Sequence, residues 1–489
     1  MIARSGLQGL LMHSAVYWVG VMVSKLIGFM LIPVYTHHLS PADYGTLELI
    51  ALATDVTALV LGMRIGSAVF RFYHAATTAQ DKRRVVTTAV HAMVALAIVC
   101  FIILYSASGL FSQLLFSGDQ MTTAFRVMFL ATFTGLAMEL GLVYIRIRER
   151  SMLFVFIVWT QLFIMLTLNI YFIVYLRMGV LGALLGPAIA NAVLCPPLLV
   201  WVLHQVRDRF DPARLWQMVA YSAPLVPASI GLFILHFGDR FFLNHYASLE
   251  DVGVYAIAYK FGFLISQLVA YPFGLIWGNR LYVYYRDPNR DRLFNQTLSG
   301  FCFFLVGSAL AISLFIPEVL SIMTPPEYWA AGALVPAIAM AYVFGGMNQL
   351  AAAPLYTESR TGIVAVISLS AAAVNLLLNF ILIPTYGVWG AAAATAASFL
   401  LILGCSLAAS RHISSLRWQY GRALKPMAAA LILLAAGHAI DWANPWVAVG
   451  YKALLLISYV PLLLLLKFIS AEEWHTLRSL VPVRRHEPG

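Results

Sequence analysis

The stretch from Lys25 to Arg64 reads KLIGFMLIPVYTHHLSPADYGTLELIALATDVTALVLGMR. It leaves one apolar segment, passes through LSPADYG (residues 39–45) as a turn, and enters a second apolar segment. The two segments also hold Glu48 and Asp55. A Lys, Arg or Asp at mid-membrane costs roughly 2.5–3.5 kcal/mol on insertion scales. If these segments span a membrane, their charges therefore indicate a functional site or internal ion pairs.

The composition places the whole chain in a membrane. Its 489 residues are 61% hydrophobic and only 11% charged, and apolar runs of spanning length follow one another from end to end. We therefore predict an all-α polytopic membrane protein with about fourteen transmembrane helices. The expected spans centre near Met22, Ala53, Ala97, Gly135, Ile164, Ala192, Ser229, Ile265, Val306, Ala341, Ala372, Ala397, Leu433 and Leu456.

The net charge of +10 reflects orientation in the membrane rather than nucleic-acid binding. The basic residues lie in short connectors, and most of the 31 Lys and Arg fall on alternate connectors, on one side. This distribution predicts that both termini are cytoplasmic, and it provides no basic domain for a nucleic acid. The main clusters are Lys82–Arg84, Arg146/Arg148/Arg150, Arg207/Arg209/Arg214, Arg286/Arg290/Arg292 and Arg484–Arg485.

The N-terminal apolar run and the four cysteines are both typical of ordinary membrane segments. The first apolar run, from about His13 to Pro33, is of full spanning length, so we expect a permanent helix rather than a cleaved signal peptide. The four cysteines lie far apart inside apolar spans, which predicts neither a disulfide framework nor a metal site. They are Cys100, Cys195, Cys302 and Cys405.

An internal repeat organises the chain. SPADYG (residues 40–45) corresponds to SLEDVG (residues 248–253), and GVLGA (residues 179–183) corresponds to GVWGA (residues 387–391), both 208 positions later. The shared offset predicts a duplication of two six-helix units. An even number of helices per unit keeps the two halves in the same orientation, so the repeats are parallel.

The repeat predicts three parts. Residues 1–210 form an N-terminal lobe of helices one to six, and residues 211–424 form a C-terminal lobe of helices seven to twelve. Residues 425–489 hold helices thirteen and fourteen and a cytoplasmic tail, outside the repeat.

Several motifs resemble those of a known family. The first helix ends near Pro33, LSPADYG (residues 39–45) follows, and GMRIGSAVFR (residues 62–71) closes the second span. In the second half, Asp239-Arg240 precedes DVGVYA (residues 251–256). Together these look like bacterial polysaccharide-biosynthesis flippases, the Wzx-like branch of the multidrug/oligosaccharidyl-lipid/polysaccharide exporter superfamily.

The resemblance implies both an architecture and a function. The two lobes would surround a central cavity and export an undecaprenyl-pyrophosphate-linked oligosaccharide by alternating access. The location would be the bacterial cytoplasmic (inner) membrane, and the product would serve lipopolysaccharide or exopolysaccharide synthesis. A polysaccharide polymerase and other assembly proteins are expected partners.

Cationic residues in three spans are the candidate substrate site. The chain is similar, more distantly, to lipid II flippases, in which cationic residues of helices one, two and eight face the cavity. Lys25, Arg64 and Lys260 fall in those helices here, and fixed cations provide charge-assisted hydrogen bonds to a pyrophosphate. The alternatives are an ion pair for Lys25, for instance with Asp55, and snorkelling to the interface for Arg64.

Three carboxylates have two possible roles. Glu48, Asp55 and Glu139 either carry a coupling proton or sodium ion or neutralise the cationic residues, and we favour the second role because intramembrane charges usually pair. No other cofactor is expected. Asp55 and Arg64 lie nine residues apart, on nearly opposite helix faces, so a direct pair would need a bend near Gly62.

Three further charged residues lie near the ends of spans. Asp239 and Arg240, at the outer end of span seven, are expected either to lock the lobes together or to form a salt bridge at the membrane edge. Lys452, at the start of span fourteen, is expected to snorkel.

Two rival functions are weaker. A cation-coupled multidrug exporter of the same superfamily would, by resemblance, favour an acidic first helix, whereas this chain has Lys25 there. A membrane glycosyltransferase, polymerase or ligase would need a large outer loop or an acidic metal motif, and the outer connectors contain neither. We therefore predict a transporter rather than an enzyme.

Overall fold

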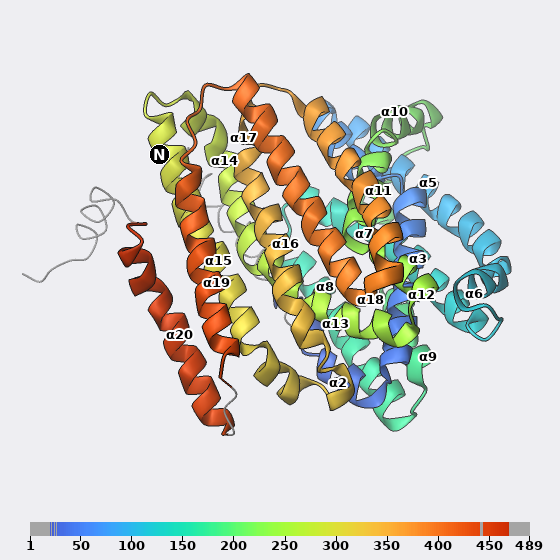
Figure 1. Cartoon of the computed structure of the whole chain (residues 1–489). Coiled ribbons are helices and arrows are strands. Elements are labelled where there is room, and N and C mark those ends of the chain that lie inside the picture. The colour runs from blue at the N-terminus through green and yellow to red at the C-terminus, as the bar shows by residue number, and fades with distance from the viewer. Residues whose placement is uncertain (1–19, 21, 24, 26, 441–443, 469–489) are drawn as a thin grey trace, which may run out of the picture. The chain divides into compact units, whose positions relative to one another are not determined.

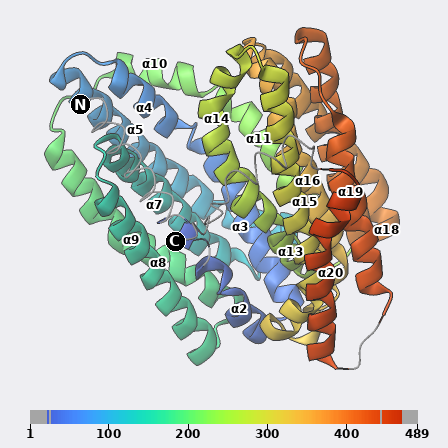
Figure 2. The ribbon, with the colours of Figure 1, turned by 90° about the vertical axis from the view of Figure 1, so that its left-hand side faces the viewer.

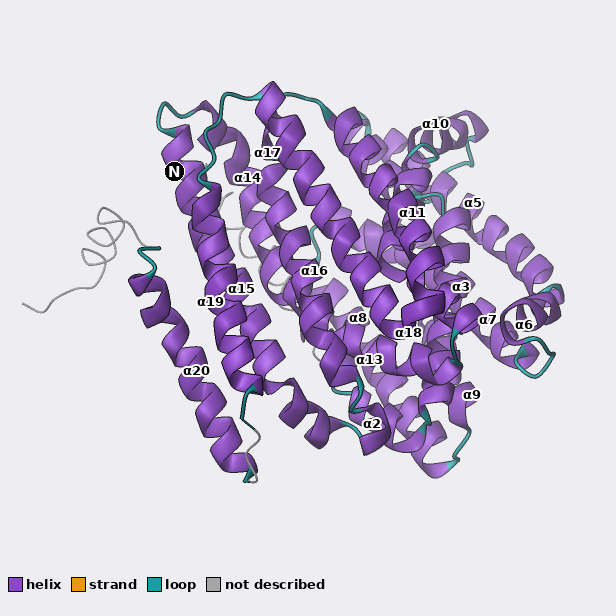
Figure 3. Ribbon diagram, viewed as in Figure 1, coloured by secondary structure: helices purple, strands orange, loops and turns teal. Residues whose placement is uncertain are grey.

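The computed structural model describes residues 20, 22, 23, 25, 27–440 and 444–468 (Figure 1). Helices joined by short loops make up the described chain, and none of these residues forms a strand (Figure 3). The predicted all-α membrane fold is confirmed. The expected first span lies mostly outside the described residues, and the tail with Arg484 and Arg485 lies wholly outside them.

The membrane spans follow the hydropathy closely. Among the described residues, ten helices are long and apolar enough to cross a membrane, or eleven if the bent pair Pro212–Ser222 and Leu225–Phe237 forms one span. The helix Thr361–Ile413 has 53 residues and non-helical backbone at Gly387, so it contains two of the expected spans. The expected centres from Ala53 to Leu456 each fall within a described helix. The number fourteen stays a prediction.

The chain groups into two compact units that are defined by packing. Unit 1 comprises residues 1–256, 323–328 and 376–391, and unit 2 comprises residues 257–322, 329–375 and 392–489. The lobes expected from the repeat, with borders near 210 and 424, stay a prediction. The complete helices of unit 1 are α2 (Ile32–His38), α3 (Pro41–Leu61), α4 (Ile65–Ala75), α5 (Ala79–Ser106), α6 (Ser108–Phe116), α7 (Thr122–Ile147), α8 (Ser151–Ile170), η1 (Tyr171–Tyr175), α9 (Gly179–Gln205), α10 (Pro212–Ser222), α11 (Leu225–Phe237), α12 (Asp239–Tyr246) and η3 (Pro326–Tyr328).

Unit 2 contains the later helices, with α13 (Leu249–Ile265) and α18 (Thr361–Ile413) contributing to both units. Its other helices are η2 (Ser266–Ala270), α14 (Tyr271–Arg286), α15 (Arg290–Met323), α16 (Ala331–Ala351), α17 (Ala353–Thr357), α19 (Tyr420–His438) and α20 (Pro445–Leu465).

Helix α7 lies at the centre of unit 1 and packs against α5, α9 and α3. Its side chains Phe125, Phe129 and Ile145 are completely buried. Two apolar clusters along α7 hold it in place, one with α4, α5 and α9 and one with α3, α5 and α6. Polar residues on α7 are therefore carried by a rigid helix.

An ion pair inside unit 2 corrects one expectation. Lys452 Nζ of α20 lies 2.5 Å from Glu318 Oε1 of α15, and both side chains are largely buried, at 13% and 20% exposed. The prediction that Lys452 snorkels is wrong, because a carboxylate on the neighbouring helix compensates its charge.

Ser40 and Ser248, which correspond in the repeat, cap the starts of α3 and α13. The backbone N–H of Asp43 donates to Ser40 Oγ at 3.1 Å, and that of Asp251 donates to Ser248 Oγ at 3.1 Å. In each case the serine hydroxyl also donates to the aspartate Oδ2. Because the capping box and Pro41 at the first helical position start α3 at once, residues 41–45 form its first turn rather than a loop.

The first glycine of the second repeated motif has a positive φ in both halves. Gly179 has a φ of +58° and Gly387 a φ of +54°, values that glycine adopts without a steric penalty. Positive φ at glycines 208 positions apart agrees with the duplication that the sequence predicts.

The two capped helices touch through their glycines. A Cβ atom on Gly45 would collide with Leu249 O and lie 3.0 Å from Gly253 N. A Cβ atom on Gly253 would likewise collide with Pro41 O and lie 3.1 Å from Gly45 N. The first turns of α3 and α13 thus meet backbone to backbone in a reciprocal contact, which we call the glycine contact.

A buried tyrosine supports the same end of α3. Tyr328 donates its hydroxyl to Leu39 O at 2.9 Å, and its ring lies edge-on to Tyr44 with centroids 6.0 Å apart. Burial raises the pKa of Tyr328 well above its usual range, so the hydroxyl keeps the proton that it donates. The connector after α15 is thereby fixed to the start of α3.

Candidate functional site

The second membrane span is broken where its charge lies. Helix α3 ends at Leu61 and α4 begins at Ile65, and between them Met63 and Arg64 have φ values of 45° and 54°. Left-handed backbone at a residue other than glycine costs of order 1–3 kcal/mol and often marks a functional site. The bend that a pair between Asp55 and Arg64 would need is present, but no ion pair joins these two described residues.

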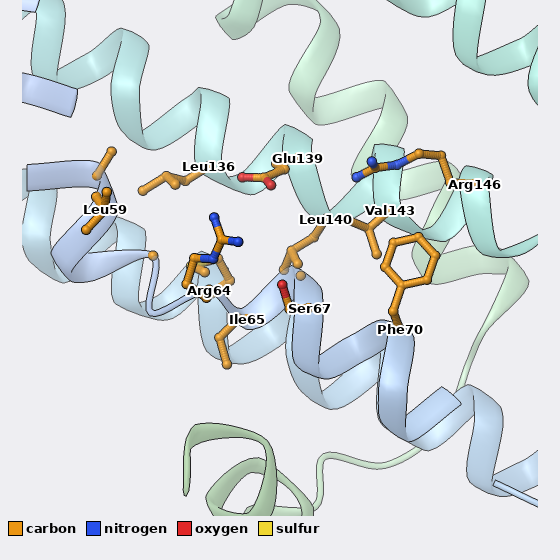
Figure 4. A pocket seen from close by; sticks show the side chains of 14 residues that line it. Leu59, Arg64, Ile65, Ser67, Phe70, Leu136, Glu139, Leu140, Val143 and Arg146 are labelled. Atoms are coloured by element: carbon orange, nitrogen blue, oxygen red, sulfur yellow. The ribbon is translucent and has the colours of Figure 1, made fainter. Parts of the chain in front are cut away.

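The break opens a pocket of about 400 Å³ within unit 1. Its walls come from the end of α3, the break itself, α4, α5 and the middle of α7 (Figure 4). The lining residues are Ala58, Leu59, Gly62, Arg64, Ile65, Gly66, Ser67, Phe70, Met93, Leu136, Glu139, Leu140, Val143 and Arg146. We call this the break pocket.

Three charged side chains share the break pocket. In Figure 4, Arg64 and Glu139 point toward one another and Arg146 points into the same space. Across the described chain, none of the three takes part in an ion pair. Two guanidinium groups and one carboxylate leave a positive charge in a wall that is otherwise mostly apolar, an arrangement suited to an anion.

Arg146 is held more firmly than the other two. Its guanidinium carbon lies 5.5 Å from the centroid of the Phe70 ring and 5.8 Å from that of Phe154. Its Nε is buried and makes no hydrogen bond within the described structure, which leaves one donor to be satisfied by a ligand or water. Arg64 and Glu139 are exposed to the pocket.

The sequence placed Arg64 and Glu139 among the candidates but missed Arg146. Arg146 was assigned to a cluster of basic residues that orients the chain in the membrane. A signal was available, because Glu139 and Arg146 are seven residues apart and so lie on one face of a helix, two turns apart.

Lys25 and Lys260 lie outside the break pocket. Lys25 is exposed in the helical residues that precede α2, and Lys260 is half-buried on α13. They belong to different packing units. Their convergence on one substrate stays a prediction.

Glu48 and Asp55 lie on α3, two turns apart, and neither lines the break pocket, whose α3 wall begins at Ala58. Glu48 is half-buried and Asp55 is exposed. Their assignment as coupling groups or charge partners is untested.

Asp239 and Arg240 form a buried ion pair within unit 1. Both side chains are 1% exposed, and Arg240 Nη1 lies 2.7 Å from Asp239 Oδ1. Arg240 also donates to His236 O at 2.8 Å, and Tyr255 donates its hydroxyl to Asp239 Oδ2 at 2.6 Å. The pair is buried because the rings of Phe237 and Tyr255 cover the guanidinium, each 5.2 Å from it.

A buried asparagine links two helices of unit 1. Asn169 is fully buried and its Nδ2 donates to Tyr35 Oη at 2.7 Å. This interhelical hydrogen bond joins α8 to α2.

Comparison with known proteins identifies the family. The polysaccharide biosynthesis protein family matches residues 10–277, more than half of the chain. The chain belongs to this family. The chain is 24% identical over 212 residues to the probable low-salt glycan biosynthesis flippase Agl15 of Haloferax volcanii. That match covers 41% of this chain and 44% of the relative, so the chain matches less than half of that relative's length.

Solved structures confirm the expected superfamily fold. The lipid II flippase MurJ in an inward closed conformation superposes with a TM-score of 0.74 at 14% identity, covering 91% of this chain and 97% of that one. An inward-facing multidrug resistance MATE transporter of the MOP superfamily gives a TM-score of 0.63 at 15% identity, covering 79% and 94%. At these identities the likeness concerns the fold alone, and the relatives named are flippases and transporters.

Proposed function

We propose that this family member is a flippase that moves an undecaprenyl-pyrophosphate-linked oligosaccharide across the cytoplasmic membrane by alternating access. The product serves surface polysaccharide or lipopolysaccharide synthesis, and both termini lie in the cytoplasm. A polymerase and other assembly proteins receive the product. The observation that carries this proposal is the break pocket, in which Arg64 and Arg146 face one space without an ion pair.

The chemistry of the headgroup explains the need for such a pocket. A pyrophosphate has to leave bulk water, and its charge has to be compensated as it does so. Arg64 and Arg146 offer planar, always charged guanidinium groups that can each contact two phosphate oxygens. Glu139 repels an anion at close range, so it limits the affinity and favours release on the other side.

The break pocket also argues against the drug-exporter alternative. A cationic drug would gain little from a pocket with two arginines and one glutamate, because like charges repel. Neutralising Arg64 and Arg146 therefore distinguishes the two functions. Transport by an exporter of cationic dyes should improve, whereas transport by a flippase for an anionic headgroup should fail.

Neutralising the arginines is expected to weaken headgroup binding. Hydrogen bonds to charged groups contribute about 1.5–3 kcal/mol each, so Arg64→Gln and Arg146→Gln should each weaken binding of inorganic pyrophosphate roughly ten- to hundred-fold. Calorimetry on the purified protein measures the affinity, and polysaccharide export in cells without their own flippase measures transport. Arg148→Gln is the matched control, because Arg148 is exposed just beyond α7 and does not line the pocket.

The same export assay tests Lys25 and Lys260. Lys25→Ala with Lys260→Ala should stop export while the protein stays in the membrane at its normal level. Full export by this double variant would show that neither lysine is part of the substrate site. Unchanged pyrophosphate affinity in the two arginine variants would show that the break pocket does not bind the headgroup.

The alternative to the charge-partner role is that a proton or sodium ion couples transport through Glu48, Asp55 or Glu139. Flipping in vesicles should then fall when the proton and sodium gradients are collapsed with ionophores. Replacing the coupling carboxylate by its amide should abolish this dependence. Full activity after both gradients are collapsed would leave the three acids as charge partners only.

A further inference from the structure

Helix α10 has an apolar outer face that nothing in unit 1 covers. Its buried face carries Met218 and Ser222, which pack against α4 and α5. On the opposite face, Pro212, Ala213, Trp216 and Ala220 are exposed and apolar, and the polar residue Gln217 is exposed beside them. Trp216 is 73% exposed, and Phe210 just before the helix is 45% exposed. Phe210, Pro212, Ala213, Trp216 and Ala220 form what we call the α10 face.

The helix is fixed firmly enough for its outer face to be a defined surface. Thr87 donates its hydroxyl to Val206 O at 2.5 Å, and the backbone N–H of Asp211 donates to Thr88 Oγ1 at 3.1 Å. Arg71 lies over the Tyr221 ring, 4.2 Å from its centroid. The linker before α10 and the inner side of α10 are thus both attached to the body of unit 1.

The α10 face lies where a membrane interface is expected. Figures 1 and 2 place α10 at the end of unit 1 opposite α2. It follows the candidate span α9 and precedes α11, and the axes of α10 and α11 differ by 42°. Tryptophan is enriched at the headgroup level of membranes because its ring is apolar and its N–H is polar.

The charges beside the face fit an anionic headgroup layer. Arg207 and Arg209 are exposed next to Phe210. The nearby acids are already engaged, since Asp208 pairs with Arg84 at 3.5 Å and Asp211 caps α10 by accepting from Arg214 N at 3.0 Å. Among the described residues, Arg207 Nη2 contacts only the exposed His204 Nδ1, at 2.5 Å. Both arginines stay exposed and can reach lipid phosphates, while the apolar face enters the acyl boundary.

We propose that the α10 face docks in the bilayer interface and that Arg207 and Arg209 recognise anionic lipid headgroups there. The occupant is the lipid surface itself, because the face is narrow, mostly apolar and flanked by cations just after the candidate span α9. The docked helix α10 anchors unit 1 at the level of the lipid headgroups. This inference is independent of the substrate that is transported.

Fluorescence quenching locates Trp216. The full-length protein is placed in nanodiscs of phosphatidylcholine or of phosphatidylcholine with phosphatidylglycerol, using lipids brominated near the headgroup. The difference between wild type and Trp216→Phe isolates one tryptophan among the eleven. We expect Trp216 to be quenched by brominated lipid and protected from iodide in the water. Quenching by iodide alone would overturn the proposal and leave the face for a protein partner.

Lipid binding tests the arginines. Near a membrane surface each Lys or Arg contributes about 1 kcal/mol of attraction to anionic lipid. Arg207→Gln with Arg209→Gln should therefore lower the affinity for phosphatidylglycerol roughly thirty-fold, measured by native mass spectrometry. The matched control is Arg148→Gln with Arg150→Gln, two exposed arginines of the same unit, which should change it little. An equal loss in both variants would overturn specific recognition by the α10 segment.

Discussion

Replacing Arg240 by alanine is expected to lower the free energy of unfolding by about 3–5 kcal/mol, because the Asp239 carboxylate would be left buried without its cation. Asp239 is 1% exposed, so water cannot take over the role of the guanidinium. Tyr255→Phe should cost less, about 1.5–3 kcal/mol, since it removes one hydrogen bond to a charged group.

The chain carries its own reporters for this measurement. Cys100, Cys195 and Cys302 are buried and all four cysteines are free, so a thiol-reactive dye reports thermal unfolding in detergent. Arg84→Ala is the control, because its pair with Asp208 is partly exposed and should contribute about 0–1 kcal/mol. If Arg240→Ala unfolds at the wild-type temperature, the Asp239–Arg240 pair does not support the fold.

Replacing Gly253 by alanine is expected to separate α3 from α13 and to stop transport. The new Cβ would collide with Pro41 O, a backbone atom that cannot rotate away, and Gly45→Ala would collide with Leu249 O in the same way. Overpacking of this kind costs about 1–3 kcal/mol, which shifts an equilibrium between closed and open forms about 5- to 150-fold. On the predicted orientation, the glycine contact lies on the outer side of the membrane.

Labelling of a cysteine beside the glycine contact measures this opening. Val252 is fully buried, so Val252→Cys should react slowly with a membrane-impermeant maleimide in an otherwise wild-type chain. Adding Gly253→Ala or Gly45→Ala should raise the labelling rate. Gly300→Ala is the matched control, since a Cβ there meets no atom within 4 Å. Wild-type labelling and wild-type export in both glycine variants would show that the contact has no role in the transport cycle.

The amino-acid sequence alone determined the features that depend on local chemistry. Long apolar runs predict spanning helices because an unpaired backbone group in lipid costs several kcal/mol, and a helix pairs all of them within one segment. The two motif matches predicted a duplication, and the structure has equivalent serine caps at Ser40 and Ser248 and positive φ at Gly179 and Gly387. Family membership followed from the same motifs.

Only the tertiary structure decided how the charges are used. The helix break at Met63 and Arg64 places the Arg64 side chain in the break pocket. Arg146 lines the same pocket, although Arg64 and Arg146 are far apart in the sequence. Burial of Asp239 with Arg240, and the pairing of Lys452 with Glu318, likewise depend on which rings and carboxylates neighbouring helices bring near. The physical reason is that the cost of a charge in a membrane is set by its partners and its access to water, and both come from helix packing.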